Sequence, residues 1–159
     1  MLELMSDWVR TGYCGKLTTE DVGNEVILMG WVQSHRDHGG VLFIDLRDRE
    51  GIIQAVFNPE ISREVHEKSE SVRDEWVIAV RGTVSRRTPE TINPNLPTGE
   101  IEVIASELRI LNTSKVIPFL IENEINVDEH LRMKHRYLDL RRPVMRDNII
   151  TRHRERWSY

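Results

Sequence analysis

The chain has 159 residues, of which 39% are hydrophobic and 30% charged, which is typical of one globular domain with a short extension. Cys14 is the only cysteine, so an intramolecular disulfide is excluded and a cytoplasmic location is expected; no apolar run is long enough to span a membrane. The net charge of −4 is unevenly distributed: residues 1–112 contain 12 basic and 19 acidic residues, and residues 113–159 contain 10 basic and 7 acidic ones. The acidity of the first part argues against sequence-blind nucleic-acid binding, which depends on phosphate neutralisation.

Three short strands are predicted within residues 26–57. They follow a leader at residues 1–10 that we expect to be frayed, apart from Trp8, which could dock elsewhere. Each run is rich in β-branched residues and is bounded by Gly, Asp or Pro. The predicted strands are 26–33, 41–47 and 52–57, with the polar residues 34–38 and a glycine pair forming the first turn.

Alternation in the second and third strands predicts one face toward the core and one toward solvent. Phe43 and Asp45 fall on the outer face of the second strand, and Gln54 falls on the outer face of the third. An exposed aromatic residue beside hydrogen-bonding side chains is how a sheet binds unstacked bases. The alternative is that a loop covers Phe43 and that Gln54 is ordinary surface.

The rest of the first part predicts an OB-fold, a small closed five-stranded barrel that is mainly β with a helix between strands three and four. In the fourth strand Gly82 is expected to form a bulge, and in the fifth Glu102 points outward. The remaining expected elements are a helix at residues 59–73, a strand at 76–86, a long proline-containing loop at 87–99 and a strand at 100–111.

The basic part has a different character. Residues 115–119 form a candidate linker, and Asn126 is a candidate N-cap for one helix over residues 127–142. Pro143 suits the first turn of a further helix. The basic residues of these helices are interpreted as a solvated face, with contact to a phosphate backbone as the alternative.

Several motifs, in this order, resemble the N-terminal part of a bacterial-type aspartyl-tRNA synthetase, from about Tyr13 to Arg154. They are RDHGG at residues 36–40, FIDLRDREG at 43–51, TGEIEV at 98–103 and RYLDLRRP at 136–143. The resemblance implies three segments: an OB-fold anticodon-binding domain at 1–112, a linker or hinge with a helix at 113–142, and the start of a class II catalytic domain at 143–159. We expect residues 155–159 to depart from the family sequence.

The same resemblance implies the activity of the whole enzyme, an aspartate-tRNA ligase that uses ATP and magnesium and is a homodimer in the cytoplasm. Its aspartate, ATP and metal ligands are expected after residue 159, so the chain is expected to be a truncated fragment without catalytic residues, bound cofactor or catalytic activity. The six histidines show no spacing typical of metal ligands, so no metal site is predicted.

Residue by residue, the resemblance implies an anticodon-binding set of Arg36, Phe43, Gln54 and Glu102, with Asp45 supporting Arg36 or Gln54. His38 and Gly39 match a loop near the third anticodon base, where aspartate and asparagine tRNAs differ as C against U. A His-Gly pair there resembles enzymes that accept both tRNAs. The alternative is that His38 and Gly39 simply form a tight turn.

Two other functions stay open from the sequence. One is a free-standing OB-fold module for single-stranded nucleic acid, against which the acidic barrel and the RYLDLRRP segment argue. The other is an OB-fold domain that binds protein, which needs no exposed Phe43. The three functions differ in what is bound: RNA with the matching anticodon bases, any single-stranded nucleic acid, or no nucleic acid at all.

Overall fold

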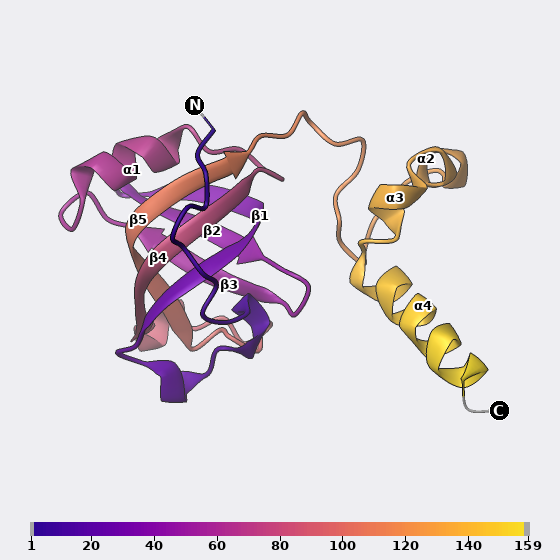
Figure 1. Cartoon of the computed structure of the whole chain (residues 1–159), viewed down its shortest axis with the longest axis horizontal. Helices are drawn as coiled ribbons and strands as arrows, with labels where there is room; N and C mark the ends of the chain where they lie inside the picture. The colour runs from indigo at the N-terminus through magenta and orange to yellow at the C-terminus, as the bar shows by residue number, and fades with distance from the viewer. Residues whose placement is uncertain (1, 158–159) are drawn as a thin grey trace. The chain divides into compact units, whose positions relative to one another are not determined.

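The computed structural model describes residues 2–157 and divides the chain into two compact units, Met1–Lys115 and Val116–Tyr159. We describe each unit by itself (Figure 1). The strands of the first unit are β1 (Glu25–His38), β2 (Val41–Arg47), β3 (Ile52–Phe57), β4 (Val77–Arg86) and β5 (Ile101–Asn112), and its α-helix is α1 (Arg63–Glu70).

The five strands form a closed barrel in the order β1-β2-β3-β5-β4, which confirms the OB-fold prediction. Neighbouring strands are antiparallel except β3 and β5, which meet in a short parallel pairing at Ala55↔Val103 and Val56↔Ile104. Helix α1 lies between β3 and β4 in the chain and packs against β5, β2 and β3. Ser62 caps α1 by accepting a hydrogen bond from the Val65 amide.

The predicted alternation sets the barrel core. Leu42, Ile44 and Leu46 of β2 are at most 5% exposed, and the residues that they pair with on β3 are buried as well. The core residues of β3 and β5 are Ile53, Ala55, Phe57, Ile101, Val103, Ala105, Leu108 and Ile110. A continuous apolar interior of this kind leaves the alternate residues on the outside, where the candidate site lies.

Two features of the strands concern irregular backbone. The bulge predicted at Gly82 is instead on the partner strand: Arg81 pairs with Glu107 and Gly82 with Ala105, so Ser106 of β5 is the extra residue. The prediction that residues 34–38 form a turn is wrong, because they continue β1 to His38, and the turn is only Gly39-Gly40, with φ of 63° and 81°. Left-handed backbone at both positions suits glycine.

The N-terminal leader is not frayed as predicted, because the Glu3 amide donates to the Ile110 carbonyl at 2.8 Å and Arg109 donates to the Met5 carbonyl at 2.6 Å. The expectation that Trp8 docks is met. Trp8 is 3% exposed, and it packs with Met29 and Ala79 on the outside of the barrel. The guanidinium groups of Arg81 and Arg109 lie over its ring at 4.7 and 4.2 Å from the centroid. Cation–π contacts and apolar burial together hold the segment against the sheet.

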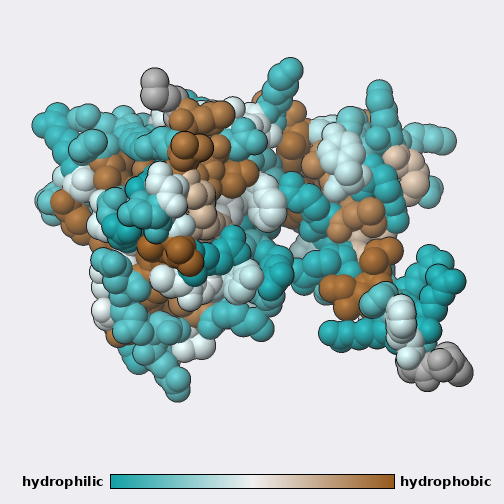
Figure 2. All heavy atoms as spheres, viewed as in Figure 1, coloured by the Kyte–Doolittle hydropathy of each residue, from teal (hydrophilic) through white to brown (hydrophobic). Residues whose placement is uncertain are grey.

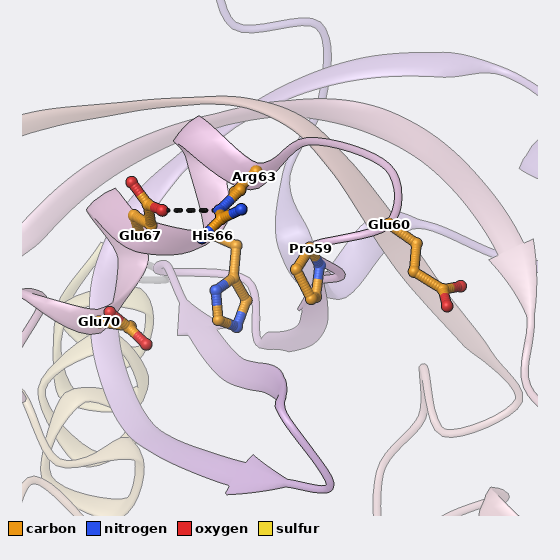
Figure 3. A pocket seen from close by; sticks show the side chains of 6 residues that line it. All are labelled: Pro59, Glu60, Arg63, His66, Glu67 and Glu70. Carbon is orange, nitrogen blue, oxygen red and sulfur yellow. Dashed lines mark hydrogen bonds and ion pairs between the residues drawn. The ribbon is translucent and has the colours of Figure 1, made fainter.

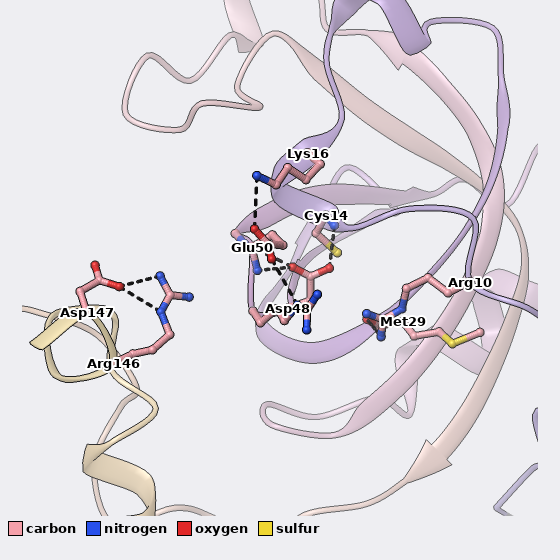
Figure 4. A network of polar contacts seen from close by, with 10 residues as sticks. Arg10, Cys14, Lys16, Met29, Asp48, Glu50, Arg146 and Asp147 are labelled. Carbon is pink, nitrogen blue, oxygen red and sulfur yellow. Dashed lines mark hydrogen bonds and ion pairs between the residues drawn. The ribbon is translucent and has the colours of Figure 1, made fainter. Parts of the chain in front are cut away.

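Cys14 is a packing residue of the barrel core with no exposed surface. Its backbone N–H donates to the Asp48 carboxylate at 2.7 Å, and Asp48 also accepts from the amides of Glu50 and Gly51 (Figure 4). Burial, followed by the Asp48 charge, raises the pKa of the Cys14 thiol. The thiol is therefore held in its unreactive protonated form.

The described part of the second unit contains the helices α2 (Glu129–Lys134), α3 (Arg136–Asp139) and α4 (Pro143–Arg156). Its small core consists of Phe119, Ile121 and Leu138, and α4 contributes no buried residue. Pro143 begins α4, as predicted. The single helix predicted over 127–142 is wrong, because His135 (φ −112°, ψ 43°) separates α2 from α3. The N-cap of α2 is Asp128, which accepts from the His130 amide, rather than Asn126.

The polar centre of this unit is Asp139, which has no exposed surface and ion-pairs with Arg142 at 2.8 Å and with Arg136. Figure 2 shows hydrophobic groups at the surface of the second unit. The exposed large hydrophobic residues of α2–α4 include Met133, Val144, Ile149 and Ile150. Among residues 2–157, no helix is both long and apolar enough to cross a membrane. Of the segment expected to depart from the family, Ser158 and Tyr159 lie outside the described residues.

Candidate nucleic-acid interface

A hollow of about 820 Å³ lies over the outer face of β1, β2, β3 and β5 and is bordered by the loop after β4. It brings together every predicted site residue except Gly39. The lining residues are Arg36, Asp37, His38, Phe43, Asp45, Gln54, Val56, Asn58, Arg87, Thr88, Thr91, Asn93, Glu102 and Ile104.

Phe43 is at the centre of this face, because it pairs with Arg36 of β1 on one side and with Val56 of β3 on the other. Its side chain is half-buried, whereas the core-facing residues of β2 are closed off from solvent. Gln54 also lines the hollow, in agreement with its predicted place on the outer face, although it is only 8% exposed. Its neighbours restrict the amide, which favours a fixed hydrogen-bonding geometry.

Asp45 supports Arg36 rather than Gln54. The Arg36 guanidinium donates to both Asp45 carboxylate oxygens, at 3.1 and 3.0 Å, and the Ser34 hydroxyl donates to one of them at 2.7 Å. The Arg36 side chain is more than half exposed, at 57%. Asp45 therefore orients an arginine whose other donors remain accessible at the edge of the hollow.

Arg87 is a lining residue that the sequence reasoning missed. It is 8% exposed, and its Nε donates to the Ile101 carbonyl at 3.0 Å. Its Nη2 is buried and has no hydrogen-bond partner among the described residues. Burial lowers the pKa of Arg87, although the Glu102 and Asp45 charges act in the opposite direction. The guanidinium thus carries an unsatisfied buried donor in the wall of the hollow.

Glu102 comes from β5, and its position on the outer face agrees with the predicted alternation. Burial raises the pKa of the Glu102 carboxyl, with the Arg87 charge opposing that shift. A carboxylate that is penalised by burial and held beside a hollow is typical of a functional site rather than of a stabilising surface residue.

His38 and Gly39 lie at the end of the β1–β2 hairpin. His38 borders the hollow and is exposed, whereas Gly39 forms the turn itself, where the Gly40 amide donates to Asp37 at 3.0 Å. The two predictions for this pair are compatible, because a tight turn places an imidazole at the rim. Thr88, Thr91 and Asn93 of the opposite loop were not predicted, since an irregular proline-containing loop has no periodicity that assigns its side chains a direction.

The hollow combines an aromatic ring with donors and acceptors of both charge signs. A stacking surface together with fixed polar groups suits unstacked nucleobases, which present a π face and hydrogen-bonding edges. Its charged residues are two arginines, Arg36 and Arg87, and three acids, Asp37, Asp45 and Glu102. The acids outnumber the arginines, so the hollow is suited to reading bases rather than to neutralising phosphates. Within the described residues, no group of three His, Cys, Asp or Glu side chains is arranged to hold a metal ion.

A second hollow runs along α1 and is lined by Pro59, Glu60, Arg63, His66, Glu67 and Glu70 (Figure 3). Arg63 is engaged by Glu67 at 3.0 Å, which leaves carboxylates as the dominant charges. All six residues come from one short segment, and no other element contributes a wall. An acidic, one-sided surface of this kind would repel a nucleic-acid backbone, so the face of β1, β2, β3 and β5 is the candidate interface.

Comparison with known proteins shows the family of the barrel. Residues 26–111, which span the barrel, match the tRNA anticodon family, described as an OB-fold nucleic acid binding domain. The chain belongs to this family. The match covers β1 to β5 almost entirely, so the anticodon-binding domain is the barrel and its helix α1.

Relatives of this anticodon-binding domain are known in much longer proteins. The chain is 53% identical over 152 residues to the aspartate–tRNA(Asp/Asn) ligase of Geotalea uraniireducens, and 56% identical over 152 residues to that of Caldanaerobacter subterraneus. Each alignment covers 96% of this chain and 26% of the relative, so the chain spans about a quarter of their length. Asparaginyl-tRNA synthetase from Pyrococcus horikoshii is structurally similar, with a TM-score of 0.69 and 28% identity over 83% of this chain and 30% of that one.

Proposed function

We propose that this chain is the anticodon-recognition part of an aspartate–tRNA ligase and that the hollow over β1, β2, β3 and β5 receives the unstacked anticodon bases. The observation that carries the proposal is the convergence of Arg36, Phe43, Gln54 and Glu102 on one hollow. These four residues come from four different strands, yet the barrel brings them together beside an unpartnered donor of Arg87.

The roles follow from the chemistry of each group. Phe43 stacks on a base, Gln54 and Glu102 take part in hydrogen bonds to base edges, and Arg36, oriented by Asp45, donates to a base or to the neighbouring phosphate. The acidic barrel supplies little phosphate attraction, so these contacts give selectivity and other parts of the protein supply most of the affinity.

We further propose that recognition of the third anticodon base is relaxed between C and U. His38 stands at the rim of the hollow, and an imidazole can either donate or accept a hydrogen bond, so it suits either pyrimidine. Gly39 leaves the turn free to adjust. The relatives' shared name, aspartate–tRNA(Asp/Asn) ligase, supports this proposal.

For the chain's organisation we propose an anticodon-binding domain at 1–112, a hinge at 113–142 and the start of a catalytic domain at 143–159. ATP-dependent attachment of aspartate to tRNA, with magnesium, in a cytoplasmic homodimer, would belong to the whole protein. By this account the 159-residue chain alone neither activates aspartate nor charges tRNA, and aspartate-dependent exchange of pyrophosphate into ATP by the pure chain would contradict it.

A free-standing module for single-stranded nucleic acid is less well supported. The ligase relatives align with 96% of the chain, including the segment after the barrel, which a simple OB-fold module would not need. A protein-binding role leaves the half-buried Phe43 and the orphaned donor of Arg87 without a purpose.

The test compares three RNA stem-loops that share one stem and differ in the anticodon: one ending in C for aspartate, one ending in U for asparagine, and one with all three bases replaced. We expect the replaced anticodon to lose at least tenfold in affinity, which is about 1.4 kcal/mol, and the C and U loops to bind almost equally. Equal binding of all three would contradict anticodon recognition. A tenfold preference for C over U would contradict only the relaxed third base.

A further inference from the structure

Strand β1 changes face in the middle. Val26, Leu28 and Val32 point into the core and are at most 6% exposed. If the period of two continued unchanged, Ser34, Arg36 and His38 would point inward as well. They point outward instead, because the β1–β2 register shifts between Val32 and Ser34, with Gln33 as the extra residue of a bulge.

This bulge is the reason that Arg36 belongs to the hollow. After it, Ser34 pairs with Asp45 and Arg36 pairs with Phe43, so all four side chains share the outer face. A shift of one residue would send Arg36 to the opposite face and replace it with His35 or Asp37.

The sequence beyond the bulge does not specify this register by itself. Residues 34–38 are Ser-His-Arg-Asp-His, which are polar on both faces of the strand. Burial of apolar side chains fixes register only where one face is hydrophobic, and strands that are polar on both faces are prone to slip. Something other than the hydrophobic pattern must therefore hold the end of β1 in place.

Contacts from the loop between α1 and β4 meet the bulge directly. The Val32 amide donates to the Trp76 carbonyl at 2.9 Å, and the Glu75 amide donates to the Val32 carbonyl at 2.7 Å. Arg47 of β2 then joins the two sides, because it donates to the Gln33 side chain through Nη1 and to the Glu75 carboxylate through Nη2, at 2.7 and 2.8 Å. We call Gln33, Arg47 and Glu75 the bulge clamp.

Two features show that the clamp is costly to build. The Arg47 and Glu75 side chains are only 10% and 7% exposed, and desolvation offsets much of the attraction within a buried ion pair. Glu75 also has φ of 63°, a left-handed conformation that is unfavourable for a residue with a side chain. A buried ion pair on strained backbone is a poor source of stability but a precise way to fix one geometry.

Resting on the proposed anticodon function, we propose that the bulge clamp is a positioning device for anticodon recognition. Gln33, Arg47 and Glu75 touch no base themselves; none of them lines the hollow. They hold the register of β1 so that Ser34 and Asp45 orient Arg36 beside Phe43. The clamp thereby determines which of several polar side chains faces the RNA.

The experiment is a double-mutant cycle with the aspartate stem-loop as the probe, at a temperature where circular dichroism shows every variant folded. Glu75→Gln removes the charge that holds Arg47. Gln33→Leu breaks the hydrogen bond between Arg47 and the bulge and leaves the buried ion pair intact, so it replaces Glu75→Gln if that variant does not fold. Each is measured alone and combined with Arg36→Ala. Glu107→Gln is the matched control, because it also neutralises the partner of an arginine, Arg81, but away from the hollow.

We expect either clamp variant alone to weaken binding roughly tenfold, the scale of one hydrogen bond to a charged group. In the Arg36→Ala background the same change should cost less than about twofold, because the side chain that it positions is already gone. The clamp variants are also combined with Phe43→Ala, where the tenfold loss should persist. Glu107→Gln should leave affinity unchanged.

Equal losses with and without Arg36 would show a merely structural role and overturn the proposal, as would clamp variants that bind like the unmodified chain. The two levels of the argument remain distinguishable. Failure of the unmodified chain to prefer the aspartate stem-loop over one with a replaced anticodon would overturn the proposed function first, and the clamp's role with it.

Discussion

Replacing Phe43 by alanine separates a base-stacking residue from a core residue. Phe43 is half-buried on the outer face of β2, whereas Phe57, on the adjacent strand, is 1% exposed in the core. Phe57→Ala removes a fully packed ring and should cost about 3–5 kcal/mol of unfolding free energy. Phe43→Ala removes a ring with one free face, so its cost should be nearer 1 kcal/mol, about half of what full burial of such a side chain contributes.

Binding should show the opposite order. Stacking of one base on an aromatic side chain is worth about 1–3 kcal/mol, so Phe43→Ala should weaken the aspartate stem-loop by roughly 5- to 150-fold. Urea denaturation gives the stability of both variants, and fluorescence anisotropy with labelled RNA gives their affinities. A stability loss at Phe43 as large as that at Phe57, or unchanged RNA affinity, would refute the stacking role.

Three further changes test the charges and the thiol described above. Burial raises the pKa of the Glu102 carboxyl in the folded protein. Folding stability therefore falls as the pH rises from the ordinary glutamate pKa through this raised value, because the buried carboxylate becomes charged. Glu102→Gln should raise the melting temperature at pH 7, give no gain in acid, where both side chains are neutral, and weaken RNA binding. Asp139→Ala should lower the free energy of unfolding, measured by chemical denaturation, by about 3–5 kcal/mol, because it leaves the buried Arg142 without its ion-pair partner. Asp147→Ala breaks an exposed ion pair with Arg146 and should lower it by less than about 1 kcal/mol. Cys14, fully buried with a raised pKa, should react with iodoacetamide only when denaturant is added; rapid alkylation of the native chain, measured by mass spectrometry, would contradict that packing.

The regular parts of the barrel could be predicted from the sequence because one physical rule governs them. Leu42, Ile44 and Leu46 alternate with Phe43 and Asp45, and burial of the first set leaves the second outside. The same rule placed Glu102 correctly on β5. Predictions of the outer face were therefore sound wherever an apolar face existed to define the opposite one.

The prediction failed where the local sequence pattern does not indicate which way the side chains point. Residues 34–38 are polar on both faces, so neither their strand conformation nor the bulge at Gln33 could be predicted. The side chains that contact the bulge, Arg47 and Glu75, are distant in sequence. Arg87 was missed for a related reason, because it lies where β4 passes into an irregular loop. The docking site of Trp8 could not be predicted, since nothing near it in sequence indicates the two arginines that enclose its ring.

The central claim is that the anticodon binds in the hollow over β1, β2, β3 and β5. Backbone amide chemical shifts of the labelled chain, followed during titration with the aspartate stem-loop, test this location most directly. We expect the largest changes over residues 34–45, around Gln54, over residues 87–93 and at Glu102, and much smaller ones with a replaced anticodon. Changes concentrated along α1 at residues 59–70, or confined to residues 116–157, would place the RNA elsewhere and contradict the account.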